Sequence, residues 1–293
     1  AQVAALSTAQ VTALTTGQIQ SIATDDVQAL TTSVVAALST TQIQALSTSA
    51  VNALTTGQVT ALTTSQVMAI ETVDLVVLKT TQVQALSSTS VAALTTDQVQ
   101  ALTTAQLVKV ETSDLAAMKT AQIAALTTAQ VAQGLTTGQV VALSTDNVQA
   151  LETDDIAVLK TSSIAGMSTK QAQALTTKQV VALSSGQIAA LSSAQVIAMG
   201  SDSIVAIETD DIGALKTNAF GAMTSAEVNA LTTDQITALK TGQIAALSTA
   251  NIAQALTTNQ IVAMSSNQFG ALSTTQFNAL STNSITAPPG VTP

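Results

Sequence analysis

The chain has 293 residues and a net charge of −9, with only 9% charged residues and no Cys, His, Trp or Tyr; every basic residue is a Lys. The absence of Cys excludes disulfides and zinc–thiolate sites, and the absence of His removes the usual general base and the commonest metal ligand. Without Arg, and with a net negative charge, binding of nucleic acid or anionic lipid is not expected. No apolar run approaches the ~18 residues that span a bilayer, so membrane insertion is not expected either. We therefore expect no enzyme, no catalytic residue and no cofactor.

An eight-residue repeat begins near the N-terminus and continues for almost the whole chain. The unit at residues 7–14 reads STAQVTAL, and the consensus is [ST]-[ST]-x-Q-[VI]-x-A-L. We number these positions 1 to 8, so that position 8 is the large apolar residue that recurs from Leu6 to Leu280. Two units, 127–135 and 248–256, have nine residues. A chain of about 34 such units indicates a solenoid.

Each unit carries the start signals of a short helix. Ser or Thr at position 1 with Gln at position 4 is the capping-box pattern, and the apolar residues before position 1 and at position 5 form a hydrophobic staple. Positions 5 and 8 are three residues apart and therefore share one helix face. We predict an all-α solenoid in which each unit is a short capped helix followed by a corner. The alternative is a β-solenoid, because Thr and Val also favour strands.

One continuous helix is excluded by the period, because eight residues advance about 800° and would rotate the apolar stripe by about 80° per unit. We expect coils of about three or four units that bury positions 5 and 8. Ala at position 7 predicts a close approach at the coil axis. Phe220, Phe269 and Phe277, all at position 5, are predicted core residues. In the nine-residue units, a bulged last turn is expected to absorb the extra residue.

The domain prediction is a single octapeptide-repeat solenoid over residues 1–286. Residues 287–293 read APPGVTP, which breaks the pattern and is expected to form a Pro-rich terminus or linker. Because Ala1 already lies in the repeat pattern, we expect a processed product or a segment of a longer protein.

Four units share the charged pattern E-T-x-D-[LI]-x-x-[LM]-K. Glu lies at position 1, Asp at position 4 and Lys at position 1 of the next unit. The four sets are Glu71, Asp74 and Lys79; Glu111, Asp114 and Lys119; Glu152, Asp155 and Lys160; and Glu208, Asp211 and Lys216. One interpretation is a ligand or cation site, but calcium normally needs six to eight oxygens. We favour structural charged corners, in which Asp interacts with the helix dipole, and we expect no metal.

The repeats also carry a resemblance to known sequences. Runs such as ALTTAQ at residues 101–106 resemble the LTTxQVxAL tracts of very large bacterial secreted or surface proteins. Those proteins look like adhesins or extracellular-matrix components, so the resemblance implies an extracellular or cell-surface location and a structural role. We expect a stalk, spacer or self-assembling filament subunit that associates end to end or laterally. The alternative is a binding module whose Thr/Ser/Gln-rich outer face contacts carbohydrate, ice or another protein.

Overall fold

A computed structural model describes residues 5–280, and over this range the chain is all-helical and contains no strand. Short helices recur about every eight residues and pack regularly, as in a solenoid. The all-α prediction is therefore confirmed, and the β-solenoid alternative is wrong. Within the same range, no helix is both long enough and apolar enough to cross a membrane. The Pro-rich terminus predicted at 287–293 lies outside the described residues.

The described chain divides into two compact units, with the boundary between Leu151 and Glu152. The prediction of one solenoid over residues 1–286 stays a prediction. The helices of the first unit are α1 (Thr8–Thr12), α2 (Thr16–Gln20), α3 (Thr24–Ala29), α4 (Thr32–Ala37), α5 (Thr40–Gln44), α6 (Thr48–Ala53), α7 (Thr56–Thr60), α8 (Thr64–Ala69), α9 (Thr72–Val76), α10 (Thr80–Gln84), α11 (Ser88–Ala93), α12 (Thr96–Ala101), α13 (Thr104–Leu107), α14 (Thr112–Ala116), α15 (Thr120–Ala124), η2 (Gln130–Gly134), α16 (Thr137–Ala142) and α17 (Thr145–Ala150). The helices of the second unit are α18 (Thr153–Val158), α19 (Thr161–Gly166), α20 (Thr169–Ala174), α21 (Thr177–Val181), α22 (Ser185–Ala190), α23 (Ser193–Ala206), α24 (Thr209–Ile212), α25 (Thr217–Ala222), α26 (Ser225–Ala230), α27 (Thr233–Ala238), α28 (Thr241–Ala246), α29 (Thr249–Gln254), α30 (Thr258–Ala263), α31 (Ser266–Gly270) and α32 (Thr274–Ala279).

Helix α8 shows how the sequence of one repeat starts and stops a helix. Thr63 is the N-cap, with φ −71° and ψ 158°, and its hydroxyl accepts the backbone N–H of Gln66. The Gln66 side-chain oxygen in turn accepts the backbone N–H of Thr63 at 2.8 Å. The C-cap Ile70 is extended, which ends the helix and turns the chain into the next unit. The same reciprocal cap recurs through both units, so the predicted capping box is confirmed.

The core of each unit is built from positions 5 and 8. In α8 these are Val67, which is fully buried, and Ile70, which is 5% exposed. Position 7, by contrast, is half-exposed in most units, so the prediction that Ala approaches the coil axis is wrong. The small residue lies half-buried in the last helical turn, and position 5 fills the interior instead.

The prediction that all three Phe side chains are core residues is correct for only one. Phe220 is fully buried, Phe269 is half-buried and Phe277 is 55% exposed. Phe269 and Phe277 lie in the last two described repeats, where no later described coil packs over position 5. Position 5 is therefore less enclosed in the last two described repeats than in the coils before them.

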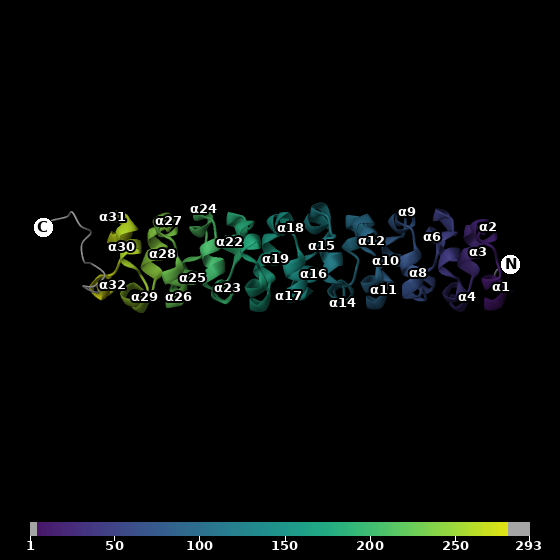
Figure 1. The fold of residues 1–293 in the computed structure, drawn as a ribbon, viewed down its shortest axis with the longest axis horizontal. Coiled ribbons are helices and arrows are strands. Elements are labelled where there is room, and N and C mark those ends of the chain that lie inside the picture. Colours follow the sequence, from purple (N-terminus) through teal and green to yellow (C-terminus); the bar gives the residue numbers. More distant parts are fainter. Residues whose placement is uncertain (1–4, 281–293) are drawn as a thin grey trace. The chain divides into compact units, whose positions relative to one another are not determined.

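Stacking follows a fixed rule within each unit. A helix packs against the helix three repeats later wherever the same unit contains one, for example α2 on α5 and α5 on α8 in the first unit, and α19 on α22 in the second. In Figure 1 the colour changes gradually within each unit, so segments close in sequence are also close in space. The interior is therefore assembled from near neighbours along the chain, as expected of a repeat protein.

The two nine-residue repeats absorb their extra residue as predicted. In the first, the last turn widens into the π-helix η2. In the second, the N–H of Leu256 donates to the carbonyl of Asn251, five residues earlier, at 3.1 Å. A different irregularity lies inside α23, where Gly200 replaces the usual Ser or Thr cap and adopts the non-helical angles φ 76° and ψ 175°, so that α23 consists of two repeat helices separated by a kink.

Candidate functional site

The side chain at position 4 does more than cap its own helix. The amide nitrogen Nε2 of Gln66 donates to the carbonyls of Val35 at 2.9 Å and Leu38 at 2.7 Å. Val35 and Leu38 are positions 5 and 8 of a repeat four units earlier, and Gln66 is only 2% exposed. One buried amide therefore caps a helix with its oxygen and joins that helix to the preceding coil with its nitrogen.

This coil-to-coil bond recurs in both units, and we call it the amide ladder. In each case Nε2 lies 2.6–2.9 Å from a position-8 carbonyl that is 28 or 29 residues earlier. The donors are Gln42, Gln58, Gln66, Gln82, Gln98, Gln106, Gln122, Gln130 and Gln139 in the first unit, and Gln187, Gln195, Gln235, Gln243, Gln260, Gln268 and Gln276 in the second. Because the bond skips 28 or 29 residues, one coil takes between three and four repeats.

The sequence reading assigned position 4 to capping alone and missed the ladder. A signal was nevertheless present, because a capping box accepts Glu as readily as Gln. Glu occupies position 4 only at Glu227, where its carboxylate accepts the N–H of Thr224 at 2.7 Å. The strong preference for Gln over Glu indicates that a second, donating atom is needed at this position.

In the charged repeats, Asp takes the place of the ladder Gln. The Glu and Lys residues are exposed N-caps of successive helices: Glu71, Lys79, Glu111, Lys119, Glu152, Lys160, Glu208 and Lys216. Asp74, Asp114 and Asp155 are buried, and Asp211 is half-buried. The charged corners are therefore not wholly at the surface, because position 4 faces the preceding coil.

The four aspartates differ in their partners. The hydroxyl of Ser88 donates to Asp114 Oδ1 at 2.5 Å, and the hydroxyl of Ser185 donates to Asp211 Oδ1. Asp155 Oδ2 accepts the N–H of its own N-cap residue at 3.3 Å. Asp74 stands apart, because its Oδ1 is a buried atom without a hydrogen-bond partner in the described part of the chain. A buried polar atom without a partner costs free energy and calls for an explanation.

Asp74 lines a surface hollow of about 500 Å³ together with Glu71. The other lining residues are Thr16, Gly17, Gln20, Gln44, Ala45, Leu46, Ser47, Thr48 and Val73. Two carboxylates therefore share this hollow with hydroxyl and amide groups, and none of its lining residues is basic. The structure thus brings Glu71 and Asp74 of the first charged set together.

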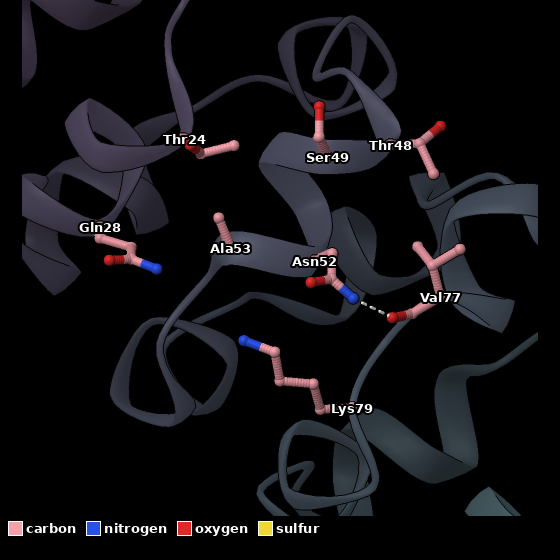
Figure 2. Close-up of a pocket in the computed structure, with 8 residues that line it drawn as sticks. All are labelled: Thr24, Gln28, Thr48, Ser49, Asn52, Ala53, Val77 and Lys79. Carbon is pink, nitrogen blue, oxygen red and sulfur yellow. Dashed lines mark hydrogen bonds between the residues drawn. The ribbon is translucent and has the colours of Figure 1, made fainter.

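Lys79, the third member of that set, lines a different hollow of about 670 Å³. Figure 2 shows its side chain extending across this hollow, between Asn52 and Gln28. The side-chain amide of Asn52 donates to the Val77 carbonyl. Apolar surface, to which Ala53 and Val77 contribute, makes up more of the lining than the hydroxyl, amide and ammonium groups do. Among the described residues no cluster of three or more acidic, His or Cys side chains forms a metal site.

The family of the chain follows from its repeats. The model of the ALTTAQ repeat matches residues 19–56, 67–104, 107–145, 148–185, 204–241 and 254–282, which together exceed half of the chain. The chain belongs to the ALTTAQ repeat family. No curated protein matches it. Among solved structures, the leucine-rich repeat-containing protein LegL7 from Legionella pneumophila shows 11% identity over 78% of this chain and 77% of that chain, with a TM-score of 0.20.

Proposed function

We propose that the protein is a structural repeat protein of the cell surface or extracellular space, serving as a stalk, spacer or filament subunit and not as an enzyme. The observation that carries this proposal is the amide ladder. Nearly every coil repeats the same buried contact. The recurring residues therefore serve to stack one coil on the next, and they do not build a single pocket.

The hydrogen bonds of the amide ladder all run in the same direction along the chain, which allows further coils to be added at either end. Each coil presents side-chain N–H donors toward the coil before it and backbone carbonyls toward the coil after it. The same contact can therefore add coils without limit, either within one chain or between copies. This supports self-association end to end, and the extracellular location rests on the resemblance to secreted and surface repeat tracts.

Electron microscopy and analytical ultracentrifugation of the purified chain test this proposal over a range of concentrations. We expect filaments, or multimers that grow by whole copies as the concentration rises. Particles that stay monomeric at all concentrations would count against self-assembly and leave only the spacer role. Immunogold labelling of intact cells tests the location, and label confined to the cell interior would overturn it.

The second candidate is a binding module, and the hollow in Figure 2 favours it. Hydroxyl and amide groups of Thr24, Gln28 and Asn52 with the Lys79 ammonium provide donors and acceptors of the kind that bind carbohydrate. Sugar sites also use aromatic stacking, and the chain has no Trp or Tyr. A glycan array probed with the labelled chain decides between the two. Saturable binding that Lys79→Ala abolishes would favour the module.

A further inference from the structure

The unpartnered oxygen of Asp74 belongs to position 4, where shorter side chains elsewhere donate to a carbonyl of the preceding coil. Asp at position 4 has the same length as Asn, and two Asn side chains occupy position 4 elsewhere. The amide of Asn147 donates to the Met118 carbonyl at 3.0 Å, and that of Asn251 donates to the Met223 carbonyl at 2.8 Å. Both acceptors are position-8 carbonyls 28 or 29 residues earlier.

The residue equivalent to these acceptors for Asp74 is Leu46, 28 positions earlier, which lines the same hollow. A carboxylate has no N–H to offer, so a side chain of this length places oxygen against oxygen. Where Asp114 and Asp211 occupy position 4, a serine hydroxyl 26 residues earlier donates to the carboxylate. The corresponding residue for Asp74 is Thr48, which makes no such bond to it within the described chain.

A cation resolves this conflict because it attracts both oxygens at once. Asp74, Glu71, Leu46, Ser47 and Thr48 line one hollow with no basic side chain, and they can offer two carboxylates, a backbone carbonyl and two hydroxyls. Oxygen-only ligands with two negative charges match calcium, which takes six to eight oxygens in flexible geometry and completes its shell with water. Magnesium demands a stricter octahedron.

We propose that Asp74, Glu71 and the carbonyl of Leu46 bind a calcium ion that joins two successive coils, replacing the amide nitrogen of the ladder. From the sequence alone, only the two carboxylates can be recognised as ligands, and no metal is predicted. The Leu46 carbonyl is not recognised because it belongs to a repeat four units away. We propose no calcium site at the other three charged sets, because none of them has a buried side-chain oxygen without a partner among the described residues.

Isothermal titration calorimetry of the full chain with calcium chloride, after treatment with chelator, tests the proposal. We expect one site with a Kd of about 10⁻⁴–10⁻³ M, the range of extracellular calcium modules. Calcium should also raise the melting temperature of the chain. No saturable binding up to about 10 mM calcium, or equal binding of magnesium, would overturn the proposal.

The decisive variant is Asp74→Asn. Its amide should donate to the Leu46 carbonyl as Asn147 and Asn251 do to theirs, so the chain folds without calcium. We expect calcium affinity to fall more than tenfold, while stability in chelator equals or exceeds that of the wild type. Glu71→Gln should weaken binding several-fold. The matched control is Asp114→Asn, which should leave calcium affinity unchanged. Unchanged calcium binding in Asp74→Asn would overturn the site.

Discussion

The side-chain nitrogen of Gln66 and the backbone carbonyl of Leu38 lie 2.7 Å apart, although 28 residues separate them in the sequence. This bond is buried, where a hydrogen bond has no water to compete with it and a missing partner is costly. Its directional geometry fixes which repeat lies over which. Apolar contacts between positions 5 and 8 cannot do this alone, because every repeat offers nearly the same apolar side chains.

Replacing Gln66 by Glu separates the two roles of this side chain. The carboxylate keeps the helix cap but turns a donor into an acceptor that faces two carbonyls. We expect a loss of about 2–4 kcal/mol, concentrated in the coils on either side. Urea denaturation followed by circular dichroism measures it.

The control is Gln18→Glu. Gln18 is exposed, and its side-chain oxygen accepts the backbone N–H of Thr15 at 2.9 Å, while its amide nitrogen makes no bond to another coil in the described part of the chain. We expect a change within about 0.5 kcal/mol. Equal losses for the two variants would show that capping, and not the ladder, explains the choice of Gln.

Capping is tested by its own pair of variants. The hydroxyl of Thr55 accepts the backbone N–H of Gln58 at 3.2 Å, so Thr55→Val removes the cap while keeping the shape of the side chain. We expect a loss of about 1 kcal/mol. Thr56, the next residue, is exposed and is not the N-cap. Thr56→Val should therefore be nearly neutral in the same melting experiment, and a reversed order would mean that the helix starts are misassigned.

Core and surface positions should respond differently to truncation. Leu86 occupies position 8 and is 3% exposed, whereas Gln84 occupies position 6 and is exposed. Leu86→Ala should cost about 2–5 kcal/mol through lost burial and a residual cavity. Gln84→Ala should change stability by less than about 0.5 kcal/mol. Since each repeat contacts only nearby repeats, hydrogen exchange should show the Leu86→Ala damage confined to neighbouring coils. Loss of protection over the whole chain would contradict this.

The π-helix depends on a close approach at Gly134. A Cβ there would lie 3.0 Å from Leu107 Cδ2 and 3.3 Å from Leu107 Cβ, so Gly134→Ala requires the Leu107 side chain to move away. We expect a loss of about 1–3 kcal/mol. At Gly138 a Cβ would meet nothing closer than 4.0 Å, so Gly138→Ala should be neutral or stabilise by about 0.4–1 kcal/mol. Thermal melts of both variants distinguish crowding from a general effect of removing glycine.

Local signals in the sequence predicted the local structure well. The caps, the short helices, the buried positions 5 and 8 and the bulged turns at both nine-residue repeats all follow from residues within one or two units. Phe277 failed for a non-local reason, because its exposure depends on whether a later coil covers it. The small size of Ala at position 7 predicts a close approach at the coil axis, whereas the residue lies half-buried in the last helical turn.

The coil-to-coil contacts could not be predicted, because the number of repeats per coil was undetermined. Without it, the partner of Gln66 cannot be located 28 residues away, and Leu46 cannot be placed beside Asp74. For the same reason the charged sets were interpreted as surface corners. Their Asp residues look like helix-dipole residues in sequence, and only the stacking shows that position 4 is interior.

The most direct measurement of the central claim is the exchange rate of side-chain amide protons by NMR. If the ladder joins successive coils, the Nε2 protons of Gln66 exchange only when those coils separate. An opening free energy of about 3 kcal/mol would slow their exchange roughly a hundredfold relative to those of the exposed Gln18. Gln66 protons that exchange as fast as those of Gln18 would show that the amide nitrogen does not hold the coils together.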